Sequence, residues 1–257
     1  MKLTPYALTY APNFKWMELP VEGSRGGKAW VKVLGKDPED GAAAALVKYD
    51  AGFELQRAKS PVFSDSLLIE GRMRLGDDVC RRLSYHYRPA GVEYGPILAE
   101  EETIRFVIIG GRGEAGSEEP VFIANVEGDP ELWEPSELGS GYRERVLRID
   151  EVANVNVTYR IANAFLVFKQ GRMWVNKAIQ EAYCVDGAGW DFVGEVDGFV
   201  ALLPGTYIHR PANETFHGSA MTFQVPRRLF VKYYDADPKT EFELAEEQDL
   251  PPVSFPE

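Results

Sequence analysis

The chain has 257 residues, of which 45% are hydrophobic and 26% are charged, as in ordinary globular proteins. Its 40 acidic and 28 basic residues give a formal net charge of -12, which argues against nucleic acid or an anionic membrane as a partner, because both attract basic patches. The two cysteines, Cys80 and Cys184, form no C-x-x-C pair, so we expect no disulfide framework. We see no secretory signal and no apolar run near the ~18 residues of a membrane span, and therefore expect a cytoplasmic protein.

In chain order, residues 1–28 contain three prolines and predict an irregular arm. Alternating apolar and polar side chains begin at residue 30 and predict half-buried strands. The strand candidates of the first half are residues 30–34, 42–49, 66–69, 72–75, 83–87 and 104–109. Short strands separated by Gly, Pro and Asp are typical of a β-sandwich or barrel. Residues 110–120 are rich in Gly and acids and lack apolar anchors, which predicts a linker.

The second half repeats segments of the first half in the same order. Residues 207–218 repeat residues 85–95 as Tyr-x-x-Arg-Pro-Ala, followed by a turn-forming residue, an aromatic residue and glycine. Residues 181–187 repeat residues 65–71, with an acid six positions before a glycine, and residues 229–234 correspond to residues 104–109. Repeated segments in the same order indicate that the chain contains a duplicated unit.

We place one unit at residues 1–110 and the other at 133–257, with 111–132 as the linker region. Duplication predicts that Gly71 and Gly187 lie on equivalent strands, and likewise Pro89 and Pro211. A single large β-sandwich is the alternative, but it does not explain the order of the repeated segments.

With the turn Pro204-Gly205 before a strand, these repeats make the chain resemble the cupin superfamily, specifically two-domain cupins related to the ChrR-type anti-sigma-factor cupin domain. The resemblance covers most of residues 29–110 and 133–235. It implies an all-β fold of two tandem cupin jelly-roll barrels, an architecture that closes its sheet edges. Together with apolar runs such as residues 106–109, it also implies a homodimer.

Metal-binding cupins carry a His-x-His pair, then a Glu and a later His, a mixed site suited to transition metals. By the resemblance, these positions of the first half hold Ala58, Ser60, Asp65 and Tyr94. We therefore expect no transition metal in the first barrel. Its interior should be apolar or filled, with Phe53, Phe63 and Tyr94 as candidate fillers.

In the second half the same positions hold Trp174, Asn176, Glu181 and, one residue out of register, His217. Glu181 and His217 are the candidate catalytic residues, as general base and general acid facing one cavity of the second barrel. A single divalent transition metal held by these two residues is the less favoured alternative, because open catalytic sites typically keep three protein ligands. The plainer interpretation is that both are buried polar groups with hydrogen-bond partners.

The candidate ligand-binding residues are polar or aromatic and lie on the segments around this pair: Trp174, Asn176, Tyr183, His209, Arg210 and Phe216. His209 and His86 fit ordinary core or surface positions equally well. Arg88 and Arg210 occupy equal places in the repeats and could clamp a carboxylate bidentately. Because both halves keep the arginine while the rest of the site differs, structural ion pairs are favoured.

Two functions remain open. One is an enzyme acting on a small organic acid or aromatic substrate, through lyase-like or isomerase-like acid–base chemistry or metal-dependent dioxygenase-like chemistry. The other is a non-catalytic bicupin that has lost its metal site and senses or carries a small molecule.

Overall fold

The computed structural model describes residues 7–36, 42–110, 119–135, 141–151, 154–164, 173–193, 198–213, 216–222, 225–234 and 242–244. Only the backbone is described at residues 7, 58, 173–176, 192–193, 198–199, 216–222 and 242–244. The described chain forms two compact units, one of residues 10–131 and the other of residues 7–9 with residues 132 onward. Within these ranges, no helix is long and apolar enough to cross a membrane.

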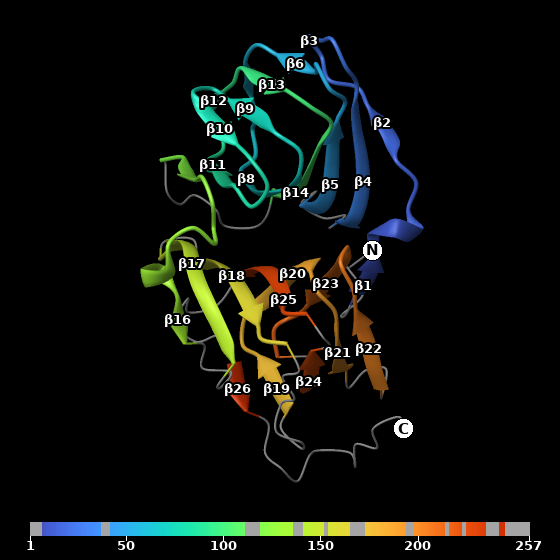
Figure 1. The fold of residues 1–257 in the computed structure, drawn as a ribbon, viewed down its shortest axis with the longest axis vertical. Coiled ribbons are helices and arrows are strands. Elements are labelled where there is room, and N and C mark those ends of the chain that lie inside the picture. Colours follow the sequence, from blue (N-terminus) through green and yellow to red (C-terminus); the bar gives the residue numbers. More distant parts are fainter. Residues whose placement is uncertain are drawn as a thin grey trace. The chain divides into compact units, whose positions relative to one another are not determined.

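The first unit consists of antiparallel strands and two short 3₁₀ turns (Figure 1). Its larger sheet has the order β15 (Val121–Ile123), β11 (Tyr85–Arg88), β8 (Ser64–Glu70), β14 (Thr103–Ile109), β5 (Ala43–Tyr49), β4 (Ala29–Lys36) and β2 (Met17–Leu19). A smaller sheet has the order β10 (Asp78–Cys80), β9 (Met73–Leu75), β13 (Ile97–Ala99), β6 (Glu54–Leu55) and β3 (Ser24–Arg25). The remaining elements are the pair β12 (Glu93–Tyr94) and β7 (Ala58–Lys59), with η1 (Ala11–Asn13) and η2 (Pro130–Leu132).

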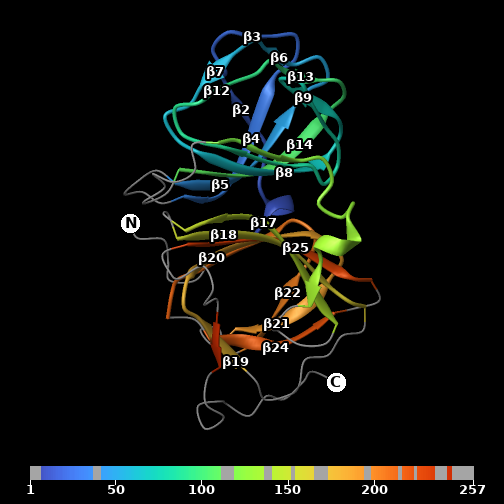
Figure 2. The same ribbon diagram turned by 90° about the vertical axis from the view of Figure 1, so that its left-hand side faces the viewer.

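The second unit has the same two-sheet plan, and Figure 2 shows its two sheets facing each other. The larger sheet has the order β1 (Ala7–Tyr10), β23 (Thr206–Arg210), β20 (Ile179–Asp186), β25 (Arg227–Tyr234), β18 (Val155–Ala162), β17 (Tyr142–Asp150) and β16 (Glu134–Pro135). The smaller sheet has the order β22 (Gly198–Leu202), β21 (Gly189–Val193), β24 (Phe216–Thr222), β19 (Met173–Asn176) and β26 (Phe242–Leu244).

The duplication predicted from the sequence is confirmed by the matching strand orders of the two larger sheets. Gly71 follows β8 and Gly187 follows β20, with φ values of +85° and +74° that favour glycine. A Cβ at Gly71 would lie 2.2 Å from the carbonyl oxygen of Glu102, and one at Gly187 would lie 2.1 Å from that of Pro226. Both turns therefore pass equally close to the backbone that leads into the neighbouring strand, β14 or β25. Pro89 and Pro211 likewise follow the equivalent strands β11 and β23.

The unit boundaries differ from the predicted ones at two short strands. β15 lies in the region predicted as linker, yet it pairs with β11 of the first unit. β1 lies in the arm predicted to be irregular, yet it joins β23 in the second unit, the place that β15 takes in the first. Edge strands of three or four residues are bound largely by main-chain hydrogen bonds, so they leave little apolar alternation in the sequence. Residues 111–118 of the predicted linker lie outside the described residues.

The register also corrects the predicted alignment of residues 104–109 with 229–234 by one position. A β-bulge skips Ile69 on β8, so that Arg105 pairs with Leu68, and a bulge at the same place on β20 pairs Leu229 with Cys184. Leu229 is therefore the equivalent of Arg105. A slip of one residue turns a side chain to the opposite face of a sheet, so the correction decides which residues face the interior.

The core of the first unit lies between its two sheets. It is a cluster of buried side chains from both: Ala29, Phe53, Leu55, Leu68, Met73, Leu75, Cys80, Ile97 and Ala99. Of the predicted fillers, Phe53 belongs to this cluster, Tyr94 packs against it and Phe63 is buried. Cys80 and Cys184 are both free and buried, and burial raises the pKa of their thiols to about 11 and about 12.

Candidate functional site

A cavity of about 140 Å³ that is partly open to solvent lies between the two sheets of the first unit. Its apolar wall is made of Leu19, Val47, Leu75, Ile97, Val107 and Ile109. Its polar groups belong to Tyr49, Ser64, His86, Arg88, Tyr94 and Arg105. No Asp or Glu lines it in the described part of the chain. The prediction of an apolar or filled interior holds for the core cluster around Phe53 but is wrong for this cavity, because alternation on β11 and β14 brings two arginines and a histidine inward.

Arg105, on β14, is held at one side of this cavity. Its side chain is buried with 9% exposure, and its Nη2 donates a hydrogen bond to Ser66 Oγ at 2.5 Å. Burial raises the pKa of the neighbouring Tyr49, although the charge of Arg105 and a hydrogen bond from it act in the opposite direction. Tyr49 is therefore a protonated phenol at neutral pH, and the arginine is held by two neutral groups.

Arg88, on β11, is held by a different partner. Its guanidinium carbon lies 3.7 Å from the centre of the Tyr94 ring, a cation–π contact. Burial lowers the pKa of Arg88, and the nearby charge of Arg105 lowers it further. Within the described residues, its Nε has no hydrogen-bond partner. Neither Arg88 nor Arg105 forms an ion pair with a described carboxylate, so two positive charges share one cavity without a counter-charge from these residues.

His86 lies on β11 two residues before Arg88 and pairs with Ser66 of β8. Along β8 this level is between Ser64, which pairs with Arg88, and Leu68, which pairs with Arg105. Burial lowers the pKa of its imidazole to about 3, and the charges of Arg105 and Arg88 contribute to the shift. The imidazole is therefore neutral at physiological pH. It can form hydrogen bonds to a ligand, but it is not in the imidazolium form that acts as a general acid.

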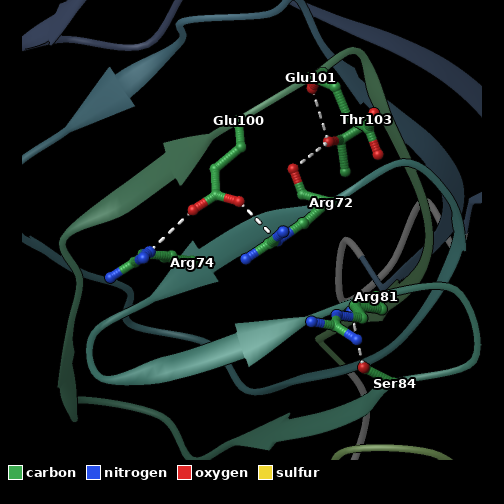
Figure 3. Close-up of polar contacts among 7 residues, drawn as sticks. All are labelled: Arg72, Arg74, Arg81, Ser84, Glu100, Glu101 and Thr103. Carbon is green, nitrogen blue, oxygen red and sulfur yellow. Dashed lines mark hydrogen bonds and ion pairs between the residues drawn. The ribbon is translucent and has the colours of Figure 1, made fainter.

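Two arginines at the surface of the same unit, Arg72 and Arg74, form ion pairs with one glutamate (Figure 3). Arg72 Nε lies 2.6 Å from one carboxylate oxygen of Glu100, and Arg74 Nε donates a hydrogen bond of 2.8 Å to the other. The hydrogen bond from Arg74 is the main cause of the lowered pKa of Glu100, and the charges of Arg72, Arg74 and Arg81 add to it. Arg72 and Arg74 thus have a carboxylate at the surface, where ion pairs contribute little, whereas the two cavity arginines have no described carboxylate partner, although burial of a charge is costly there.

In the second unit, Glu181 occupies the place of Asp65 on the equivalent strand. Its Oε1 accepts a hydrogen bond of 2.6 Å from the Tyr207 hydroxyl, and Asp65 Oδ1 accepts one of the same length from Tyr85. All four residues are buried. Burial, and then the charge of Glu181, raise the pKa of Tyr207 well above its usual value. Both repeats therefore keep a buried carboxylate–tyrosine pair, which indicates a structural role.

Alternation places Glu181 on the sheet face opposite to that of Gln180 and Ala182. Ala182 shares a core cluster with Leu202 of β22, a strand of the smaller sheet, so Gln180 and Ala182 face the interior between the two sheets. Glu181 therefore points away from the interior, contrary to the prediction. Tyr183 and His209 share the face of Glu181, because they lie two residues from Glu181 and Tyr207 on their strands.

The interior of the second unit contains a chain of hydrogen bonds in which each of two guanidiniums has a carboxylate. Arg210 Nη2 lies 2.5 Å from Asp191 Oδ2 of β21, and its Nη1 donates to the Gln180 side chain. Gln180 donates in turn to the Tyr233 hydroxyl, which also accepts a 2.7 Å hydrogen bond from Arg160. Arg160 Nε is 2.8 Å from a carboxylate oxygen of Glu144. At Arg210 the favoured structural interpretation is thus supported, whereas its equivalent Arg88 faces a cavity.

No protein-family model and no curated protein matches the chain. Solved structures do match it. A protein of Nostoc punctiforme described as a "putative dioxygenase" has a TM-score of 0.74 at 16% identity, over 94% of this chain and 87% of that one. A Bacillus subtilis oxalate decarboxylase variant has a TM-score of 0.60 at 11% identity, over 89% and 77%. A cupin 2 conserved barrel domain protein of Leptotrichia buccalis has a TM-score of 0.54 at 13% identity, over 80% and 89%.

The fold is that of a two-barrel cupin. At these identities the likeness concerns the fold alone, and function has to be argued from the residues of this chain. The two compact units are the two cupin jelly-roll barrels, and the cavity with Arg88 and Arg105 lies in the N-terminal one.

Some cupins bind a transition metal, but the residues of the N-terminal cavity do not fit one. Transition metals need several imidazole, thiolate or carboxylate ligands, whereas this cavity offers one imidazole beside two guanidiniums that repel a cation. Among the described residues of both cupin barrels, no group of three or more His, Cys, Asp and Glu side chains could hold a metal ion.

Several predicted site residues of the C-terminal cupin barrel can be placed only by their backbone. Trp174 pairs with His217, and Val175 pairs with Phe216, on neighbouring strands. The side chains of Trp174, Asn176, Phe216 and His217 lie outside the described residues. Of the predicted residues whose side chains are described, only Arg210 faces the interior, and it is occupied by Asp191 and Gln180.

Sequence reasoning missed the residues of the N-terminal cavity for two reasons. The sequence alignment of residues 104–109 with residues 229–234 is one position out of register, so it does not show that Arg105 faces the interior. Tyr49 and His86 carry no motif, since a tyrosine at a strand end and a single histidine are common core residues. The available signal was the alternation of His86 with Arg88, which puts both on one face of a strand.

Proposed function

We propose that the protein binds a small organic anion in its N-terminal cupin barrel, with a carboxylate as the group recognised by Arg88 and Arg105. The observation that carries this proposal is the pair of guanidiniums in one cavity without a described carboxylate partner. Burial of an unpaired charge costs several kcal/mol. An anionic ligand would offset this cost and form charge-assisted hydrogen bonds that can be bidentate.

The size of the cavity restricts the ligand. A protein cavity of about 150 Å³ holds a molecule such as benzene, and the volume here is about 140 Å³. The ligand therefore has roughly six to eight non-hydrogen atoms. A fold analogy supports the same class of compound, because one structurally similar protein is an oxalate decarboxylase, named for a small organic acid.

The titration behaviour of the cavity favours binding over acid–base catalysis. A general acid or base works best when its pKa is near the working pH. The pKa of His86 is about 3 and that of Tyr49 is raised by burial, so neither group exchanges its proton near neutrality. The likeness of the sequence to ChrR-type cupin domains supports the same choice, a binding or sensing module, by analogy alone.

The test is isothermal titration calorimetry with a panel of small carboxylic acids, without added metal. We expect saturable binding that is weakened at least about tenfold in Arg105→Met, since a hydrogen-bonded charge contributes about 1.5–3 kcal/mol. Arg74→Met is the matched control, because it removes an exposed arginine of the same barrel outside the cavity. Binding that is equal in Arg105→Met and the native protein would refute the proposal. A requirement for added metal would instead favour a metal-dependent enzyme.

A further inference from the structure

The two cavity arginines are attached far apart on the larger sheet of the N-terminal barrel. The strand order β11-β8-β14 puts one strand between them. Arg88 pairs with Ser64 of that strand and Arg105 with Leu68, four residues further along. At about 3.3 Å per residue and about 4.8 Å between strands, their attachment points are roughly 16 Å apart. The two side chains therefore enter the cavity from opposite corners.

Each guanidinium is also held in place by its own anchor. Arg105 is fixed by Ser66 in the middle of β8 and by Tyr49 of β5. Arg88 is fixed by the ring of Tyr94 on β12, which belongs to another sheet. Each guanidinium thus has an anchor of its own, and can act as an anion-binding point of its own.

We propose that the preferred ligand is a dicarboxylate of two to four carbons, with one carboxylate at Arg88 and the other at Arg105. The inference deepens the proposed function and rests on it. One carboxylate would leave the second guanidinium buried and uncompensated, whereas two carboxylates neutralise both. The short carbon chain follows from the cavity volume of about 140 Å³, which fits roughly six to eight non-hydrogen atoms.

The expected preference can be stated as a ratio of dissociation constants. A second hydrogen-bonded charge pair makes a dicarboxylate about ten- to hundredfold tighter than the monocarboxylate of equal length. Chain length should matter as well, since a diacid too long for the cavity has to leave one carboxylate outside. Binding should therefore fall between the four-carbon and the six-carbon diacids.

The experiment is calorimetric titration of the full chain with acetate, propionate and butyrate against oxalate, malonate and succinate, with adipate, sulfate and inorganic phosphate as further arms. The proposal expects the two- to four-carbon diacids to bind at least about tenfold tighter than the monoacids. In Arg88→Met and Arg105→Met this advantage should disappear, while weakened monoacid binding remains at the arginine that is left. Arg88→Lys keeps the charge but loses the stacked planar group, and should give an intermediate ratio. Circular dichroism of each variant checks that it is folded.

The outcomes separate this inference from the proposed function. Equal affinities for monoacids and diacids would overturn the dicarboxylate inference and leave anion binding in place. Tighter binding of adipate, or of sulfate or phosphate, would overturn it in favour of a longer or an inorganic anion. Absence of binding by every carboxylate would overturn both proposals.

Discussion

Arg88 and Arg210 occupy equivalent positions of the two barrels, so replacement of each by Met is a matched pair of experiments within one chain. Arg210 is 3% exposed and its Nη2 lies 2.5 Å from a carboxylate oxygen of Asp191, which is itself 5% exposed. Arg210→Met leaves that carboxylate buried and uncompensated. Breaking a buried pair in this way typically costs about 3–5 kcal/mol.

Arg88→Met should behave differently. It removes a partly buried charge that has no described carboxylate partner, and the Met side chain can keep apolar contact with Tyr94. The lost cation–π contact, about 0.5–2 kcal/mol, opposes the relief of the burial cost. We expect the free energy of unfolding to change by less than about 1 kcal/mol in either direction.

The assay is urea denaturation of the two variants and the native protein, followed by far-UV circular dichroism. Arg210→Met combined with Asp191→Leu is the control, because replacing both members of a buried pair by apolar groups is often nearly neutral. If Arg88→Met lowers the free energy of unfolding as much as Arg210→Met does, Arg88 is a member of a structural ion pair. The reasoning behind the anion site is then refuted.

Four further predictions concern His86, Gly71, Glu181 and the oligomeric state. The pKa of His86 is about 3 in the folded protein against an ordinary 6.5, so the unfolded chain binds more protons between these two pH values. The free energy of unfolding therefore falls as pH falls, by up to about 1.4 kcal/mol per pH unit. His86→Leu should flatten this slope in denaturation measured from pH 6.5 to 5, and an unchanged slope would contradict the prediction. Gly71→Ala should lower the free energy of unfolding by at least about 2 kcal/mol, since φ is +85° and a Cβ would lie 2.2 Å from a carbonyl oxygen. Gly52→Ala is the control, because φ is +81° but the space around it is open, and it should lower stability by only about 1 kcal/mol in the same denaturation assay. Glu181→Gln should lower stability by about 1–3 kcal/mol through the weakened hydrogen bond from Tyr207 and leave anion binding by calorimetry unchanged; a loss of binding without a loss of stability would restore the catalytic interpretation. The homodimer stays a prediction, which sedimentation equilibrium at micromolar concentration checks, and a monomeric mass would contradict it.

The duplicated all-β fold could be predicted from the sequence because its determinants are local. Period-two alternation marks a strand wherever it occurs, and Gly71 and Gly187 stand where the backbone needs a positive φ and a close approach. The acid six residues before each glycine also fell on equivalent strands, as Asp65 and Glu181. These features depend on a few neighbouring residues and can be read without knowing the partner strands.

The site could not be predicted in this way, because it depends on residues that meet only in the folded barrel. Arg88 and Arg210 stand in identical sequence contexts, yet one faces a cavity and the other is paired with Asp191 from a different sheet. The direction of Arg105 follows from its place on β14, where it pairs with Val47 of β5 and Leu68 of β8, partners that come from distant parts of the chain. Local sequence therefore determined the strands and their repetition, whereas the charge balance of each interior was decided by long-range packing, since a buried arginine is structural or ligand-binding according to what lies opposite it.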